Sequence, residues 1–399
     1  MAFEATSARR GLVRTALDAM TGGDRGAGRP RETSISAALR ESSTLVSVVV
    51  PVFNAERTLA QALSSLASQT HRNCEFICLD DGSTDSSLDI MRGFAARDGR
   101  FVVVAKDNEG YGATCNRGIA LAHGSWTAIL EPDDWVEPDM FASMLAFAGC
   151  FRTGADIVKT PYWSHVTDER GRVYRVPCPY KGRVPTSSWP FSIEEHTRLL
   201  RHRPSIWSAL YRTGFLRENG IRFVEAPGAG WTDNPFLYDT LLACDRIVYL
   251  DRAFYNYREE TPEQSAAFAR EHAQVIFDRW AEMDAIVQHR QVHDRGVLGA
   301  HCKRGLNYAR LVVDSSFDGG ASVRGALEEM VANMDSAIVF SDPEISPANQ
   351  RLFASLRGID APSIDERAWH RSLVADGLAS LRNVGLADTV RLARSRRNR

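Results

Sequence analysis

Apolar and polar positions between residues 45 and 160 form two alternating kinds of segment. Continuous β-branched runs such as LVSVVVPV predict strands that are buried on both faces, and apolar residues spaced three or four apart predict amphipathic helices. The predicted strands are 45–52, 74–81, 101–108, 125–130 and 155–160, with helices between them at 59–66, after Asp85, at 111–123 and at 137–148. Strands that alternate with helices favour an α/β fold with a parallel sheet and right-handed crossovers.

The rest of the chain has a different pattern. Residues 1–44 are rich in Arg, Gly, Ser and Ala and are interpreted as a flexible leader, the alternative being a helix that binds a membrane surface or a partner. Residues 161–207 lose the regular spacing and concentrate aromatic rings, most of which we expect in the core. Beyond Pro262 the apolar stripes are helical. We therefore predict a leader (1–44), an α/β domain (45–260) and a helical C-terminal region (261–399).

Composition narrows the class of protein. The chain has 399 residues, 44% hydrophobic and 25% charged, which is typical of a soluble globular protein. The formal net charge of −2 gives no drive toward nucleic acid. Seven scattered cysteines show no paired metal-binding spacing, and reduced thiols fit a cytoplasmic protein. The sequence contains no run of about 18 consecutive apolar residues, so we predict no membrane span.

The acidic cluster EPDDW at 131–135 directly follows a predicted buried strand. In parallel α/β sheets, ligands bind beyond the carboxyl ends of the strands, so these carboxylates are expected at a ligand site. Carboxylates suit a hard divalent cation, Mn²⁺ or Mg²⁺, which completes its shell with water and substrate phosphate oxygens. The competing interpretation is a helix cap, because Asp133 or Asp134 precedes the next helix.

Three further polar clusters follow along the chain. DDGSTD at 80–85 offers acceptors for a base N–H or ribose hydroxyls, or else is an ordinary capped turn. KDNEGYGATCNRG at 106–118 has glycines that allow close backbone approach before a helix start suited to phosphate. WTDNPF at 231–236 contributes Asp233, which by itself is more typical of a turn. The spacing of glycines matches neither a P-loop nor a dinucleotide-binding fingerprint.

Read in order, these clusters resemble the inverting family 2 glycosyltransferases with the GT-A fold. The resemblance covers roughly residues 45–260. It rests on seven stretches, VSVVVPVFNAERTLAQALSSLASQT, EFICLDDGSTDSS, KDNEGYGATCNRGIALAHG, EPDDWVEP, IWSALYRTGFLRENGIRFVE, WTDNPF and IVYLDRAFYNYR.

The resemblance implies a role for each matching residue. The nucleotide-sugar would be bound by Pro51, Phe53, Glu56, Asp80, Asp81, Asn108, Gly110, Asn116 and Glu131. Asp81 would accept from the uracil N–H, Glu131 would face the ribose, and Asp133 with Asp134 would bind the metal. Asp233 would act as the catalytic base that deprotonates an acceptor hydroxyl, in one displacement that inverts the anomeric carbon. The cation would stabilise the departing nucleoside diphosphate.

Three positions depart from the family pattern. The usual first Asp of the acidic cluster is Glu131, the usual Arg of the third cluster is Cys115, and the usual Glu before the base is Thr232. They bear on the ribose contact, on the binding of the diphosphate and on the electrostatics of the base.

The favoured interpretation is a transferase that moves a sugar from a UDP-sugar to a glycan, polyol or lipid-linked acceptor in cell-surface polysaccharide synthesis. It leaves room for peripheral contact with the inner face of a membrane and for a homo-oligomer. The alternatives are a nucleotidyltransferase and a GT-A protein that binds nucleotide-sugar without transferring it.

Overall fold

The computed structural model describes residues 43–167, 171–228, 230–259, 271–315 and 320–397. Nearly all of the predicted leader at 1–44 lies outside these ranges, so its interpretation stays a prediction. The same holds for the predicted boundary near residue 260, because residues 260–270 are also outside them.

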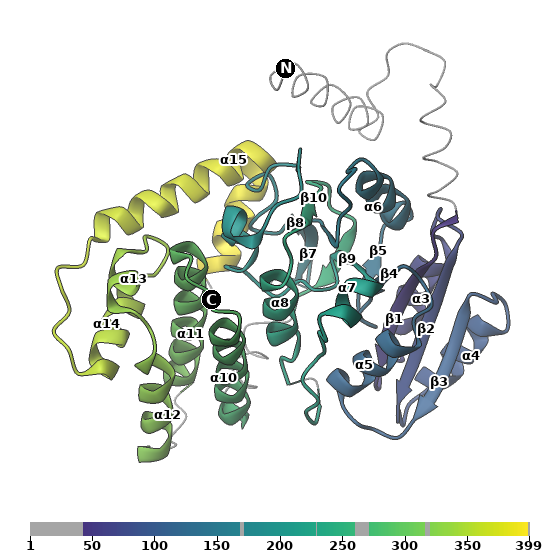
Figure 1. Ribbon diagram of the computed structural model, residues 1–399, viewed down its shortest axis with the longest axis horizontal. Helices are drawn as coiled ribbons and strands as arrows, with labels where there is room; N and C mark the ends of the chain where they lie inside the picture. Colours follow the sequence, from purple (N-terminus) through teal and green to yellow (C-terminus); the bar gives the residue numbers. More distant parts are fainter. Residues whose placement is uncertain (1–42, 168–170, 229, 260–270, 316–319, 398–399) are drawn as a thin grey trace, which may run out of the picture.

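Seven strands form one sheet at the centre of the α/β part, in the order β10-β6-β9-β4-β1-β2-β3 (Figure 1). They are β1 (Val46–Val52), β2 (Cys74–Asp81), β3 (Phe101–Lys106), β4 (Trp126–Ile129), β6 (Ile157–Lys159), β9 (Ala209–Arg212) and β10 (Ile247–Tyr249). Only β9 runs antiparallel to its neighbours, β4 and β6. All seven residues of β1 are buried, as the continuous apolar run predicts. The predicted α/β fold class is confirmed.

Helices connect these strands. They are α3 (Leu59–Ala67), α4 (Ser87–Ala95), α5 (Tyr111–Leu121), α6 (Met140–Gly149), α7 (Thr213–Glu218) and α8 (Asp233–Leu242). The helix α3 buries Leu59, Ala62, Leu63 and Leu66, the stripe that its spacing predicts. In α5, a Cβ on Gly118 would lie 2.3 Å from Val49 Cγ1, so this glycine lets the helix pack closely on β1.

A second sheet lies beside the first and has the order β5-β11-β7-β8. Its strands are β5 (Trp135–Val136), β7 (Tyr162–Thr167), β8 (Val173–Pro177) and β11 (Tyr255–Arg258), and a 3₁₀ segment, η1 (Ile193–Leu199), follows β8. Residues 161–207, in which the regular apolar spacing is lost, thus contain β7, β8 and η1. The strand β7 pairs in parallel with β11, far along the chain, so local spacing gave no sign of it.

The C-terminal region is helical in its described part, as predicted. It contains α10 (Ala273–His289), α11 (Arg295–Asp314), α12 (Gly320–Ala332), α13 (Ser336–Ser341), α14 (Pro347–Arg357) and α15 (Glu366–Arg397). The helix α10 packs on α8, and α11 packs on η1, so the region rests directly on the α/β part (Figure 1). No helix among the described residues is long and apolar enough to span a bilayer.

Candidate active site at the carboxyl ends of the strands

A cavity of about 900 Å³ opens where β1, β2, β3 and β4 end, opposite the start of α8. This size is that of a typical small-molecule site. It is lined by Pro51, Val52, Phe53, Asn54, Ala55, Thr58, Asp81, Gly82, Thr84, Asn108, Gly110, Tyr111, Thr114, Glu131, Pro132, Asp133, Trp207, Gly228, Trp231, Asp233 and Tyr257. The position is the one expected for a ligand in a parallel α/β sheet.

The charged residues that line this cavity are all acidic. Four of the lining residues are acidic, namely Asp81, Glu131, Asp133 and Asp233, and no Lys or Arg is among the described residues that line it. An anionic ligand would be repelled from such a wall unless a cation came with it. Among the described residues, no three His, Cys, Asp or Glu side chains gather into a ready metal site. A cation held by one or two carboxylates and by ligand oxygens is consistent with both observations.

The carboxylate of Asp81 is held by its own loop. Its Oδ1 accepts from the backbone N–H of Glu109 at 2.9 Å and from Lys106 Nζ, and its Oδ2 accepts from the N–H of Gly110 at 2.9 Å. These donors, with Lys106 first among them, outweigh burial and hold the pKa of Asp81 below its ordinary value. The neighbouring Asp80 was predicted to bind the nucleotide-sugar but does not line the cavity; its carboxylate accepts from the N–H of Ser83 at 3.3 Å and shapes the turn.

Two glycines set the wall after β3. Gly110 has φ +90°, and a Cβ there would lie 2.3 Å from the carbonyl oxygen of Ala226. A Cβ on Gly112 would lie 1.9 Å from the carbonyl oxygen of Val224. Neither position has room for a side chain, because the segment 224–228 passes directly against the start of α5. The backbone N–H of Tyr111 donates to the carbonyl of Gly228 at 3.0 Å and ties the two together.

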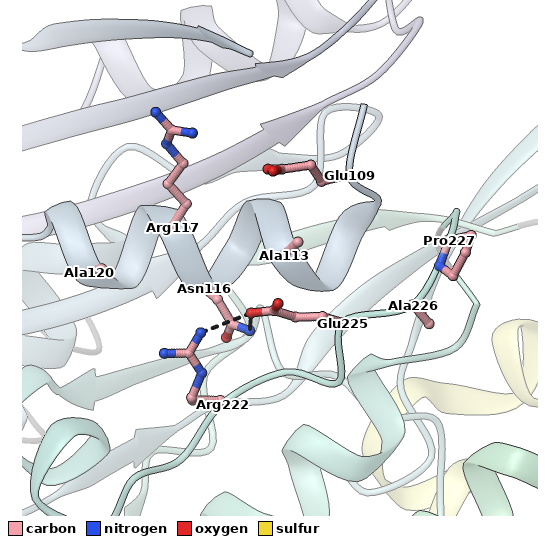
Figure 2. A pocket seen from close by; sticks show the side chains of 9 residues that line it. All are labelled: Glu109, Ala113, Asn116, Arg117, Ala120, Arg222, Glu225, Ala226 and Pro227. Carbon is pink, nitrogen blue, oxygen red and sulfur yellow. Dashed lines mark hydrogen bonds and ion pairs between the residues drawn. The ribbon is translucent and has the colours of Figure 1, made fainter. Parts of the chain in front are cut away.

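Asn116 lies outside the cavity and holds that same segment. Its Nδ2 donates to the carbonyl of Phe223 and to Glu225 Oε1, both at 2.9 Å, and its Oδ1 accepts from the N–H of Phe223 at 2.9 Å. Arg222 also donates to Glu225, at 2.8 Å, beside a shallow hollow of about 350 Å³ on the far side of α5 (Figure 2). The predicted sugar-diphosphate contact of Asn116 is not made from this place.

Glu131 follows β4 and accepts a hydrogen bond from the Tyr111 hydroxyl. Burial raises the pKa of Glu131 to about 8, and the charges of Asp133 and Asp233 add to this, although the Tyr111 bond opposes it. The carboxylates are therefore crowded enough to repel one another. A divalent cation among them would relieve this repulsion, so the donor set fits the predicted metal.

Asp133 and Asp134 point in different directions. The side chain of Asp133 is exposed and lines the cavity, where it could hold a cation. Asp134 is buried and does not line it, because its Oδ1 accepts from the N–H of Arg258 at 2.7 Å and its Oδ2 from the Tyr255 hydroxyl at 2.9 Å. The structure thus places Asp134 as a tie between the acidic turn and β11.

Glu56, like Asp80, is a predicted site residue that does not line the cavity. Its Oε2 accepts from the N–H of Ser86 at 3.1 Å, and its own N–H donates to Asp85 at 3.0 Å. It joins the loop after β1 to the start of α4. The first loop faces the cavity instead through Pro51 and Phe53.

Asp233 is the first residue of α8, and its side chain faces the cavity. Burial raises the pKa of Asp233 to about 6, against the opposing charges of Arg304 and Arg203. The pKa is thus close to neutral, as suits a general base. Just before it, Trp231 has φ +55°, a left-handed conformation that is rare for a bulky residue and marks a constrained turn.

The C-terminal region reaches Asp233 through its neighbour, Asn234. Arg304 Nη1 and the Tyr308 hydroxyl, both on α11, donate to Asn234 Oδ1 at 2.7 Å each. Since these donors occupy the amide oxygen, the amide nitrogen is directed the other way, and it donates to Asp233 Oδ1 at 3.0 Å. Arg304 is itself buried and donates also to the carbonyls of Leu200 and His202. Sequence reasoning missed this network, since α11 carries no motif that points to it.

Aromatic rings form another part of the cavity wall. Trp207 stacks on Tyr255 with ring centres 4.1 Å apart and on Tyr257 with centres 5.1 Å apart. Trp207, Tyr257 and Trp231 line the cavity, and none of them was predicted as a site residue. Trp207 belongs to the aromatic segment 161–207, but only the fold shows which of those rings faces the cavity.

Cys115 and Thr232, the two other positions that depart from the family pattern, lie behind the wall of the cavity. Cys115 has no exposed surface, and burial raises the pKa of its thiol well above the ordinary value, so it is a neutral core residue. Thr232 is likewise completely buried beside Asp233. Neither side chain lines the cavity.

Comparison with known proteins finds a family resemblance over part of the chain. Residues 47–210 match the sequence model of glycosyl transferase family 2. The chain is 44% identical to the Bacillus subtilis glycosyltransferase EpsH over 104 residues and 30% identical to B. subtilis EpsJ over 221. These matches cover 26% and 54% of this chain and 30% and 61% of the relatives, so the chain spans less than two thirds of either one.

The fold is also similar to solved structures. Staphylococcus aureus TarS, residues 1–349, superposes with a TM-score of 0.60 at 19% identity, over 82% of this chain and 91% of that one. At this identity the likeness concerns the GT-A fold, including helices that follow the α/β part. The match over residues 47–210 makes this part of the chain similar to glycosyl transferase family 2, and the superposition shows a similar fold.

Proposed function

We propose that this protein is an inverting glycosyltransferase that moves a sugar from a nucleotide-sugar to an acceptor hydroxyl. The observation that carries the proposal is the meeting of Asp233 with Glu131 and Asp133 in one cavity. The first has the pKa of a base near neutrality, and the other two provide acidic oxygens for a cation in the same cavity.

The proposed donor is a UDP-sugar. Its nucleotide would lie between the loops after β1 and β2, where Phe53 offers an exposed ring and Asp81 a carboxylate. S. aureus TarS, whose fold is similar, has been solved in complexes with UDP and with UDP-GlcNAc, which supports a uridine nucleotide as the sugar carrier. Because Asp81 already accepts from Lys106 and two backbone N–H groups, the one lone pair that remains, on Oδ2, would receive the base N–H.

Asp133 would hold the divalent cation, Mn²⁺ or Mg²⁺, with Glu131 next to it. When bound, such an ion supplies positive charge that stabilises the diphosphate leaving group. The cavity wall has no described Lys or Arg to do this instead. Asp134, predicted as a second metal ligand, would act indirectly by fixing the turn that carries Asp133.

The chemical step assigned to the chain is proton removal by Asp233. Its carboxylate would accept the proton of the acceptor hydroxyl while the oxygen bonds to the anomeric carbon and the bond to the diphosphate breaks. Attack from the face opposite the leaving group inverts that carbon. Asn234 holds the carboxylate in place, and it is fixed in turn by Arg304 and Tyr308. The helical region would therefore be part of the catalytic unit.

The proposed acceptor is a glycan, polyol or lipid-linked saccharide of the cell surface. Trp207, Trp231 and Tyr257 would contact its sugar rings, because aromatic faces pack well against the C–H surfaces of sugars. This part of the proposal rests on the family and on the aromatic wall.

Release of UDP is the test. The full chain with Mn²⁺, a panel of UDP-sugars and saccharide acceptors is expected to release UDP and form a product of inverted configuration. Asp233→Asn and Asp133→Ala should each remove transfer while the unfolding transition stays cooperative. Glu218→Gln, a surface change on α7, is the control and should keep full activity. Full activity in both cavity variants would refute the assignment.

The two alternatives give different results in the same assay. A nucleotidyltransferase would release pyrophosphate from a nucleoside triphosphate and a sugar phosphate. A binding protein would show calorimetric binding of UDP-sugars without turnover for any acceptor, which the departures at Cys115 and Thr232 motivate.

A further inference from the structure

The helix α15 is turned with its polar side toward the protein. Asp376 pairs with Arg183, Asn383 Nδ2 donates to the carbonyl of Lys181 at 3.1 Å, and Ser372 Oγ donates to the carbonyl of Pro343 at 3.2 Å. A helix that packs on a globular body normally presents an apolar stripe to it. In α15 polar side chains make these contacts instead.

The opposite side of α15 is apolar and exposed. Leu373, Val374, Leu378 and Leu381 keep 46%, 61%, 63% and 41% of their surface in solvent. At 100° per residue these four fall within one arc of the helix, away from the residues that contact the body. Figure 1 shows the longer part of α15 along the outer edge of the molecule. We call this face, Leu373, Val374, Leu378 and Leu381, the outer stripe.

Positive charge accompanies the outer stripe. Residues 366–399 contain eight arginines and three acidic residues, whereas the whole chain has a formal net charge of −2. The rest of the protein is therefore acidic. Arg367, Arg371 and Arg382 lie on the same part of α15 as the outer stripe, and the other five arginines follow in sequence after the kink at Gly385. Leucine and valine on one face together with many arginines are typical of helices that lie in the interface of anionic membranes.

We propose that α15 docks the protein on an anionic lipid surface, with the outer stripe in the interfacial layer and with Arg367, Arg371 and Arg382 facing the headgroups. A second copy of the chain fits this face less well, because pairing two such helices would bring two strongly basic segments together. The inference does not depend on the transferase activity, since docking can be measured without turnover.

The experiment is co-sedimentation of the full chain with vesicles of phosphatidylcholine, with and without phosphatidylglycerol. We expect binding to the anionic vesicles that weakens as salt is raised, and little binding to the neutral ones. The double variant Val374→Glu with Leu378→Glu should bind the anionic vesicles about tenfold more weakly or worse.

A matched control separates the outer stripe from net charge. Val102→Glu with Leu121→Glu adds the same two charges at residues that are 45% and 40% exposed on β3 and α5. We expect this control to bind within about twofold of the natural chain, and melting curves and UDP release to be unchanged in both double variants.

Several results would overturn the proposal. They are absence of binding by the natural chain, equal binding to neutral vesicles, or an equal loss in the control. Light scattering tests the alternative that a second copy of the chain binds the outer stripe. A natural chain that is dimeric and does not bind vesicles, with a dimer that dissociates in the α15 variant, would assign the outer stripe to a second copy.

Discussion

Replacing Asp233 by Asn should stabilise the protein while it abolishes transfer. Burial raises the pKa of this carboxyl from 3.8 to about 6, although Arg304 and Arg203 oppose the shift. Each pKa unit corresponds to about 1.4 kcal/mol. The ionised carboxylate therefore costs the folded state about 3 kcal/mol once the pH is above both values.

The dependence on pH has a definite sign. An acid whose pKa is raised by folding costs nothing below its unfolded value of 3.8, because it is protonated in both states. The cost grows as the pH rises and is complete above about pH 6. At pH 5 linkage gives roughly half of the full cost. Asparagine is neutral throughout, so its advantage over aspartate should follow the same curve.

Thermal unfolding at pH 5 and pH 8 measures this difference. We expect Asp233→Asn to raise the melting temperature by roughly 3–6 °C at pH 8 and by about half as much at pH 5. The control is Asp133→Asn, in the same cavity but exposed, which should change stability by less than about 0.5 kcal/mol. A variant that melts at or below the natural chain at pH 8 would refute the reasoning, and an equal gain at both pH values would assign the effect to something other than ionisation.

Three further predictions concern the surroundings of the base and the donor. Arg304→Lys should move the acidic limb of the pH–rate profile to higher pH and lower kcat by about tenfold. Tyr308→Phe should lower kcat by less. A loss of kcat in both variants with an unshifted pH–rate profile would contradict a positioning role. Gly112→Ala should raise the KM for UDP-sugar about tenfold or more, by displacing the segment 224–228, whereas Gly325→Ala, which has open space around it, should keep KM unchanged. Asp81→Asn should weaken UDP binding in calorimetry by about tenfold, and undiminished affinity would remove this residue from the nucleotide site.

The sequence located the sheet and most of the cavity because both follow from local pattern. Buried parallel strands read as continuous apolar runs, and the polar residues that end them must lie at one edge of the sheet. Eight of the predicted site residues therefore line one cavity, namely Pro51, Phe53, Asp81, Asn108, Gly110, Glu131, Asp133 and Asp233.

The sequence pattern does not predict the role of a residue where that role depends on the direction of a single side chain. Asp133 and Asp134 are adjacent, yet one faces the cavity and the other bonds to β11, a strand much later in the chain. Glu56 and Asn116 similarly hold neighbouring segments rather than the cavity. Trp207 could not be assigned for a related reason, since its place depends on contacts between distant strands.

The departure at Thr232 is explained by the same balance that sets the pKa of Asp233. A second carboxylate at this completely buried position would add a like charge next to the base and raise its pKa further. A base with a much higher pKa would be protonated at neutral pH and unable to accept a proton. With Thr232 in that place, burial raises the pKa and Arg304 lowers it, leaving it at about 6. Asp233 is then mostly ionised at pH 7, so threonine at this position is compatible with general-base catalysis and does not require the protein to be a binding protein alone.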